Sequence, residues 1–226
     1  MEKGGAFVVL VIDYSFDWSK IFRGTNVRVE QCQWKHLDMR FEDGKLICDI
    51  EGDPNAFTRA AQSNRTVVSP SAVLVRNFPL GLRGEHFRNL CLCLMISRVV
   101  CVNGAECLLA TTDRAVLYAK LLQVQSQLGK DVFPVVALNY YSNSQGTGRG
   151  MEPKKIEGKT VIKVGSTNAG FGKSMIQNKD QRDDLWSILA LTKEYVTEEP
   201  FIEHEFEYRV QVMQKKKKIL ICCKNH

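Results

Sequence analysis

The segment from Val161 to Lys173 constrains the fold more than any other part of this chain. It reads VIKVGSTNAGFGK, an apolar stretch carrying one lysine and then a glycine-rich loop that ends in a second lysine. Glycines in such a loop let backbone N–H groups approach phosphate oxygens without a Cβ atom in the way. Two ammonium groups beside that loop favour an anionic ligand. The segment therefore predicts a site for a nucleotide polyphosphate.

A P-loop is the first alternative for this segment. Gly172, Lys173 and Ser174 fit the end of the pattern G-x-x-x-x-G-K-[ST], but Thr167 stands where its first glycine belongs. A P-loop lysine also opens a helix, whereas residues 174–178 read SMIQN, which is short and roughly alternating and so favours a second strand. A glycine loop joining two antiparallel strands over phosphates is the arrangement of ATP-grasp domains. A plain hairpin turn, with lysines for solubility, stays open.

Length, composition and charge bound the class of protein. The chain has 226 residues, of which 44% are hydrophobic and 25% charged, as in ordinary globular proteins of one large or two small domains. The net charge of +6 is spread along the chain apart from Lys215 to Lys218, and no nucleic-acid motif is present. We therefore expect nucleotides or acidic lipid surfaces as partners, and not nucleic acid. Apolar runs fall short of the roughly 18 residues of a membrane span, so membrane contact is expected to be peripheral.

The cysteines and histidines indicate neither a disulfide framework nor a metal site. The chain holds eight cysteines, but its first apolar run, Phe7 to Ile12, is too short for a signal peptide. A reducing, cytoplasmic location is the better expectation. Cys91 and Cys93 lie in the apolar segment LCLCLMI, where cysteine acts as a small buried hydrophobe. The four histidines show no ligand spacing, and no metal ligand is predicted.

Apolar periodicity predicts an α/β domain in the first part of the chain. Ala6 to Ile12, Ser71 to Val75 and Arg98 to Val102 are β-branched runs typical of strands buried on both faces. Between the last two, Glu85 to Ser97 has apolar residues at helical spacing, so strand, helix and strand form a crossover unit of a parallel sheet. The segment from Asp43 to Ser69 contains turn signals and is left unassigned.

The second part of the chain mixes helices and strands. Asp113 to Leu128 is predicted as a helix with Thr112 as its N-cap, and Phe133 to Leu138 as a strand. Beyond the glycine loop, Asp180 to Val196 carries one apolar face and is predicted as an amphipathic helix. The chain closes with a strand-like pair around the lysine run at residues 215–218.

Six phrases between Asp17 and Gln211 occur together in an order and spacing that resemble a known family. They are DWSKIFRG from Asp17, VRVEQ from Val27, VLVR from Val73, GEHFR from Gly84, the Val161 to Lys173 segment, and EPFIEHEFEYRVQ from Glu199. In these phrases the chain resembles the synapsins, neuronal phosphoproteins that coat synaptic vesicles. The resemblance extends from about Phe7 to Gln211.

The resemblance implies an α/β fold in two domains. Residues 1–102 would form a small parallel-sheet pre-ATP-grasp domain, and residues 103–226 the N-terminal part only of an ATP-grasp domain. The second half of that fold, which supplies the carboxylate and amide ligands of a divalent metal in the family, has no counterpart here. We therefore expect this chain alone to hold no metal. Without that metal a triphosphate is poorly neutralised for transfer, so we predict no catalytic residue and no enzyme activity.

The resemblance also assigns residues to phosphate binding. Lys163 matches the family lysine that touches the phosphates and the adenine side of the nucleotide. Gly170, Gly172 and Lys173 match the glycine loop that folds over the phosphates. Arg114 falls where the family has another nucleotide-binding lysine, which keeps the charge and changes the donor geometry.

An adenine-binding segment is implied as well. Glu199, Phe201 and Ile202 match the interlobe segment, where backbone groups and an apolar side chain would hold the adenine. An alternative of equal weight is a proline-led strand that packs a core phenylalanine. The sequence also departs from the family, because Ser166 and Asn168 replace two loop histidines.

These features predict a synapsin-like, vesicle-associated protein with a degenerate or partial ATP site. It would act in neurotransmitter secretion through association with an anionic vesicle membrane and with itself or other synapsin chains, on the cytoplasmic surface of synaptic vesicles. The alternative is a fragment of an ATP-grasp carboxylate–amine ligase. A third possibility is a truncated product that folds only with a full-length partner.

Overall fold

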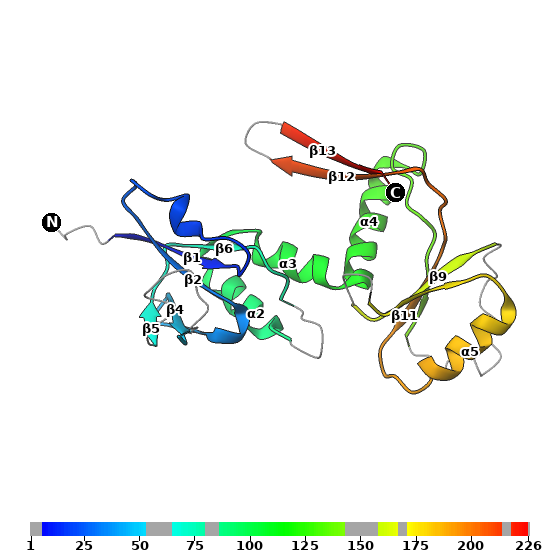
Figure 1. The fold of residues 1–226 in the computed structure, drawn as a ribbon, viewed down its shortest axis with the longest axis horizontal. Coiled ribbons are helices and arrows are strands. Elements are labelled where there is room, and N and C mark those ends of the chain that lie inside the picture. The colour runs from blue at the N-terminus through cyan, green and yellow to red at the C-terminus, as the bar shows by residue number, and fades with distance from the viewer. Residues whose placement is uncertain are drawn as a thin grey trace. The chain divides into compact units, whose positions relative to one another are not determined.

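The computed structural model describes residues 6–52, 65–79, 86–142, 158–166, 171–213 and 218–225. Contacts within the chain divide it into two compact units, residues 1–133 and 134–226, whose elements are labelled in Figure 1. The domain boundary after Val102 comes from the sequence resemblance and stays a prediction. No helix among the described residues is long and apolar enough to cross a membrane.

A four-stranded parallel sheet organises the first unit (Figure 1). Its order is β2 (Val27–Cys32), β1 (Phe7–Ile12), β6 (Ala72–Val75) and β7 (Val100–Val102). β1 lies between two parallel neighbours and is buried over its last four residues, as its unbroken apolar run predicts. Helix α2 (Arg88–Ser97) connects β6 to the parallel strand β7, which confirms the predicted crossover.

A second, antiparallel sheet of three strands was not predicted from the sequence. It consists of β3 (Leu37–Glu42), β4 (Lys45–Ile50) and β5 (Thr66–Val68) in that order. Asp43 and Gly44 connect β3 to β4 with φ angles of 49° and 75°, the left-handed backbone that two-residue hairpin turns require. Two short 3-10 helices, η1 (Trp18–Lys20) and η2 (Trp34–His36), flank β2.

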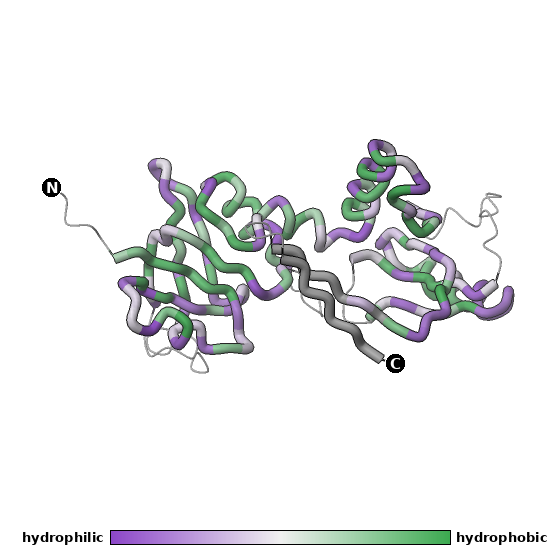
Figure 2. The backbone as a smooth tube through the Cα atoms, turned by 90° about the horizontal axis from the view of Figure 1, so that it is seen from above, coloured by the Kyte–Doolittle hydropathy of each residue, from purple (hydrophilic) through white to green (hydrophobic). Residues whose placement is uncertain are grey.

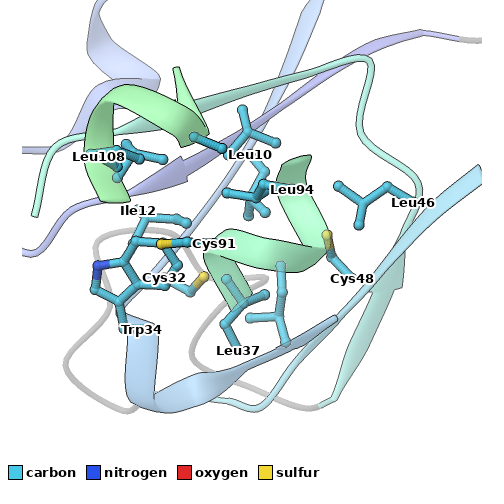
Figure 3. Close-up of a cluster of buried hydrophobic side chains, with 14 of the residues drawn as sticks. Leu10, Ile12, Cys32, Trp34, Leu37, Leu46, Cys48, Cys91, Leu94 and Leu108 are labelled. Atoms are coloured by element: carbon cyan, nitrogen blue, oxygen red, sulfur yellow. The ribbon is translucent and has the colours of Figure 1, made fainter. Parts of the chain in front are cut away.

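The hydrophobic core of the first unit forms where both sheets meet α2 (Figure 3). Figure 2 shows hydrophobic segments along the strands of this unit. Cys91 is fully buried in this core, which confirms that it acts as a small hydrophobe, while Cys93 is partly buried at its edge. The buried side chains labelled in Figure 3 are Leu10, Ile12, Cys32, Trp34, Leu37, Leu46, Cys48, Cys91, Leu94 and Leu108.

Two helices follow β7. α3 (Ala105–Thr112) adds Ala105 and Leu108 to the core, and α4 (Arg114–Leu128) begins after Asp113. The predicted N-cap, Thr112, was wrong by one residue. The Asp113 carboxylate accepts hydrogen bonds from the backbone N–H groups of Ala115 and Val116, whereas the Thr112 hydroxyl donates back to Leu109 within α3.

The second unit is built on an antiparallel sheet in the order β10, β9, β11, β8. These strands are β8 (Asn139–Tyr141), β9 (Thr160–Val164), β10 (Lys173–Ile176) and β11 (Val196–Pro200). β9 and β10 are antiparallel neighbours on either side of the glycine loop, which confirms the predicted second strand and excludes a P-loop helix there.

The strand predicted over residues 133–138 was wrong. Residues 134–138 form no regular element, and pairing with β11 begins at Asn139. The half-buried Tyr141 packs against the core of this unit, where its ring meets Trp186 edge-on at 5.0 Å. The pairing that places Tyr141 against Trp186 begins at Asn139, and so leaves the apolar run before it outside the sheet.

Helix α5 (Lys179–Leu189) packs on one face of this sheet. The Asn178 side chain caps it by accepting from the Gln181 N–H at 2.9 Å. The predicted end at Val196 was wrong, because Val196 begins β11 and is fully buried against Ile162 and Leu189. Its helical spacing from the apolar face of α5 was a coincidence.

The last two strands form a separate antiparallel pair. β12 (Phe206–Met213) and β13 (Lys218–Asn225) pair along their whole length. This confirms the strand-like pair predicted at the end of the chain.

Candidate functional site

Two lysines lie opposite each other on the two strands of the glycine-loop hairpin, β9 and β10. The register pairs Lys163 of β9 directly with Lys173 of β10. Directly opposed residues of an antiparallel pair project from the same face of the sheet and interact. The predicted phosphate-binding lysines are therefore neighbours on the face opposite the one that packs Ile162 and Ile176 against α5.

Glu199 of β11 supplies a negative charge to the same face. It lies two residues beyond Thr197, the residue opposite Lys163, and its carboxylate forms an ion pair with the Lys163 ammonium. The Lys163 and Glu199 side chains are 25% and 23% exposed. The resemblance assigns Glu199 to adenine binding through its segment, but the structure shows its side chain in an ion pair with Lys163, the lysine predicted to bind phosphate.

The glycine loop is anchored at its base. The Val164 N–H donates to the carbonyl of Gly172 at 2.8 Å, and the Gly165 N–H donates to the carbonyl of Tyr195 at 2.8 Å. Gly165 and Gly172 both have positive φ angles, of 50° and 61°. The hydroxyl of Ser166 lies 2.9 Å from that of Tyr195. Gly170 lies outside the described residues.

The segment after β11 is exposed. Phe201 and Ile202 are 38% and 55% exposed, and β11 ends at Pro200, so Phe201 is not the core residue of a strand. The Phe201 N–H donates to the Lys159 carbonyl at 2.8 Å. Among the described residues the Ile202 N–H has no hydrogen-bond partner, so it is one backbone donor that a ligand could use.

Lys159 and Glu203 form an ion pair beside this segment. The Lys159 ammonium donates to the Glu203 carboxylate at 2.8 Å, and this hydrogen bond lowers the pKa of the Glu203 carboxyl. Both side chains are largely exposed, so the pair orients the segment and contributes little to stability.

Arg114 is the first residue of α4 and belongs to the first unit. Its side chain is half-buried. The predicted residues brought together within one sheet are therefore Lys163, Lys173 and Glu199.

The opposite face of β11 carries a polar cluster that sequence reasoning missed. Glu198 is fully buried, and its carboxylate accepts two hydrogen bonds from Arg182 of α5, one from the Tyr141 hydroxyl and one from the Thr160 hydroxyl. Burial, followed by the nearby Glu198 charge, raises the pKa of Tyr141 to about 12. Glu198 thus ties α5 to the sheet, while its neighbour Glu199 faces the lysines.

Among the residues that the structure describes, no group of three or more histidine, cysteine, aspartate or glutamate side chains is placed to hold a metal ion. The charged side chains that the described strands place together on this face are Lys163, Lys173 and Glu199.

Comparison with known families identifies the chain. Residues 2–101 match the family model of the synapsin pre-ATP-grasp domain, and residues 103–224 match that of the synapsin ATP binding domain. The chain belongs to the synapsin family. A synapsin of Drosophila melanogaster is 26% identical over 225 residues, which cover 93% of this synapsin chain and 21% of the fly protein. The chain thus spans about a fifth of the length of that curated relative.

Solved structures similar to this synapsin chain share its fold. A RimK domain ATP-grasp protein from Sphaerobacter thermophilus is 15% identical with a TM-score of 0.58, over 90% of this chain and 68% of that one. D-alanyl-alanine synthetase A from Vibrio cholerae is 10% identical with a TM-score of 0.56, over 95% and 64%. D-alanine-D-alanine ligase from Helicobacter pylori is 13% identical with a TM-score of 0.54, over 97% and 74%. The predicted fold class, a parallel-sheet pre-ATP-grasp domain followed by an ATP-grasp-like domain, is confirmed.

Proposed function

We propose that this chain binds ATP on the lysine-bearing face of the sheet of the second unit, formed by β10, β9, β11 and β8. The observation that carries the proposal is the direct opposition of Lys163 and Lys173 at the base of the glycine loop. Like charges placed opposite each other destabilise a strand pair, so their pairing makes most sense where an anion binds between them. The match of residues 103–224 to an ATP binding domain supports the same ligand.

Each part of the nucleotide has a proposed partner. Lys163 and Lys173 bind the phosphates, together with backbone N–H groups of the loop at Gly170 and Gly172. The exposed side chains of Phe201 and Ile202 cover the adenine, and the Ile202 N–H, which has no partner among the residues that the structure describes, donates to one of its ring nitrogens. Glu199 belongs to the site through its ion pair with Lys163, whereas the role of Arg114 stays a prediction from the resemblance.

The test is ATP binding by isothermal titration calorimetry on wild-type protein, Lys163→Ala and Lys179→Ala. Lys179 is the matched control, because it lies on α5 in an exposed ion pair with Asp183. We expect the Lys163 variant to bind ATP at least about ten-fold more weakly, since it loses a charge-assisted contact, and the Lys179 variant to bind as the wild type does. Equal binding by all three proteins would remove ATP from the proposal.

We further propose that the protein acts at the cytoplasmic surface of synaptic vesicles, in neurotransmitter secretion, through peripheral contact with anionic membrane and through self-association. Membership of the synapsin family and the net charge of +6 support this role. Co-sedimentation with anionic liposomes, compared with neutral ones, tests the membrane part, and light scattering against concentration tests self-association. Absence of sedimentation with anionic liposomes would count against vesicle contact. The structural neighbours include ligases, but at 10–15% identity they establish the fold alone, so we propose no ligase activity.

A further inference from the structure

We propose that the carboxylate of Glu199 is an internal competitor for the anion site. In the absence of ligand the Glu199 carboxylate forms an ion pair with the Lys163 ammonium, and a polyphosphate binds by displacing this carboxylate. Glu199 would then determine how strongly the site takes up a polyphosphate anion. This inference rests on the polyphosphate site proposed above.

The register of three strands supports the exchange. Lys163 of β9 lies between Lys173 of β10 on one side and Thr197 of β11 on the other, and Glu199 follows Thr197 on the same face. The face thus holds two positive charges and one negative charge within neighbouring positions. The Lys163 and Glu199 side chains are each about one-quarter exposed, so solvent and ligand can reach the pair.

Electrostatics makes Glu199 and a phosphate mutually exclusive partners. A phosphate that contacts the Lys163 ammonium comes within a few ångströms of the Glu199 carboxylate, where like charges repel appreciably at the dielectric of a protein surface. The carboxylate must therefore move when the anion arrives. Lys163 keeps a charged partner in both states, so the strand itself need not rearrange.

Thr197 offers a polar partner for the exchange. Its hydroxyl is buried and, among the described residues, has no hydrogen-bond partner. It is directly opposite Lys163 and two residues from Glu199, on the same face of the sheet. A hydroxyl can both accept from an ammonium and donate to a carboxylate, so Thr197 can take up either group once the pair separates.

A purely structural ion pair predicts a different behaviour. In that case removal of the Glu199 charge would change stability and raise anion binding only as much as removal of any nearby carboxylate. Glu203 provides the matched comparison, because it follows β11 closely along the chain and pairs with its own lysine, Lys159. Glu199→Gln and Glu203→Gln change the net charge equally.

The experiment titrates inorganic pyrophosphate into wild-type protein, Glu199→Gln and Glu203→Gln, with thermal unfolding to check the fold of each. We expect Glu199→Gln to bind pyrophosphate about ten-fold more tightly than the wild type, since it removes both a competitor and a repulsion. Glu203→Gln should stay within about two-fold of the wild type, as for an exposed charge. Adding Lys163→Ala to Glu199→Gln should abolish the gain.

Equal affinities of the two glutamine variants would overturn the inference, as would the absence of pyrophosphate binding in all proteins. If Glu199→Gln fails to fold, the test uses NMR spectroscopy of the wild-type protein, in which glutamate is labelled with carbon-13 at the side-chain carboxyl. Pyrophosphate should then shift the Glu199 carboxyl resonance and leave that of Glu203 in place, and a static Glu199 resonance in the bound state would refute the exchange.

The outcomes also separate this inference from the ATP proposal. Loss of ATP binding in Lys163→Ala with no gain in Glu199→Gln would leave the nucleotide site standing without an internal competitor. If Glu199→Gln gains affinity for pyrophosphate but the wild-type protein does not bind ATP, the role of Glu199 as a competitor would be supported and the proposal of ATP binding refuted.

Discussion

Arg182 on α5 and Glu198 on β11 form a two-point ion pair between helix and sheet. The two terminal guanidinium nitrogens donate to the two carboxylate oxygens at 2.7 and 2.8 Å. Tyr141 and Thr160 donate to the same carboxylate, at 3.0 and 3.1 Å. A fully buried carboxylate is thus surrounded by donors, and this holds α5 at one position on the sheet that carries the lysines.

Arg182→Ala should destabilise the protein by about 3–5 kcal/mol, because it leaves the buried Glu198 charge without its cation. Equilibrium unfolding in urea measures the change. Lys179→Ala, which breaks an exposed pair with Asp183 on the same helix, is the control and should cost no more than about 1 kcal/mol. Similar losses in the two variants would show that the buried pair contributes no more than a surface one.

The hydrogen bonds of Asp13 predict that the stability of the protein falls at acidic pH. Burial raises the pKa of its carboxyl, but hydrogen bonds from Trp18 and Ser15 outweigh burial and bring the pKa below its usual value of 3.8. A carboxyl whose pKa is lower in the folded state stabilises the protein above the unfolded pKa and loses that contribution as the pH falls through the folded one. Asp13→Asn should therefore cost about 1–3 kcal/mol at about pH 7 and progressively less below about pH 4. Urea unfolding of both proteins across this range is the measurement, and a constant difference would contradict the role of the charge.

Strong local patterns explain what the sequence predicts about the fold. β1 is an unbroken apolar run, and α2 has clear helical spacing between two such runs, so the crossover follows from the chain alone. The hairpin at Asp43 and Gly44 carried an Asp-Gly turn signal, but it was missed because the segment after β4 is mixed in character. The end of α5 was misplaced because Val196 satisfied a helical period while belonging to a strand.

The candidate site likewise has some features that local sequence predicts and others that depend on contacts between distant segments. The opposition of Lys163 and Lys173 follows from a hairpin closed by the glycine loop, so local sequence is enough to suggest it. The ion pair of Lys163 with Glu199 depends on the register of β11 against β9, and α5 with its connections separates these strands along the chain. Which of Glu198 and Glu199 faces the lysines likewise follows only from that register, because a shift of one residue would exchange their faces.

The cysteines of the first unit should differ strongly in reactivity. Cys48 and Cys91 are fully buried, and burial raises the pKa of their thiols to about 12 and about 11. Cys107 on α3 is exposed. Because the thiolate is the reactive form, a thiol reagent at about pH 8 should modify Cys107 at least about a hundred-fold faster than Cys48 or Cys91. Peptide mapping by mass spectrometry against time gives the rates, and rapid modification of Cys48 in the folded protein would contradict its burial.

Gly165 should tolerate a methyl group less well than Gly44, although both have positive φ angles. An alanine at either position is strained by about 1–2 kcal/mol. A Cβ atom at Gly165 would also lie 2.7 Å from the Glu194 carboxylate oxygen, whereas nothing lies within 4 Å at Gly44. Urea unfolding should therefore show a slightly larger loss for Gly165→Ala than for Gly44→Ala, because the exposed Glu194 carboxylate can turn away at a small cost.

The excess loss at Gly165 should disappear when Glu194→Ala is added, because the exposed Glu194 side chain is the group that a Cβ atom would meet. The strain of the positive φ would remain, so the double variant should still be less stable than Glu194→Ala alone, by about the cost seen at Gly44. Equal losses at the two glycines, or an excess that persists without the Glu194 side chain, would show that backbone conformation alone makes glycine necessary at the start of the loop. Relief by Glu194→Ala would instead show that the Glu194 side chain packs closely against the base of the loop that leads to Lys173.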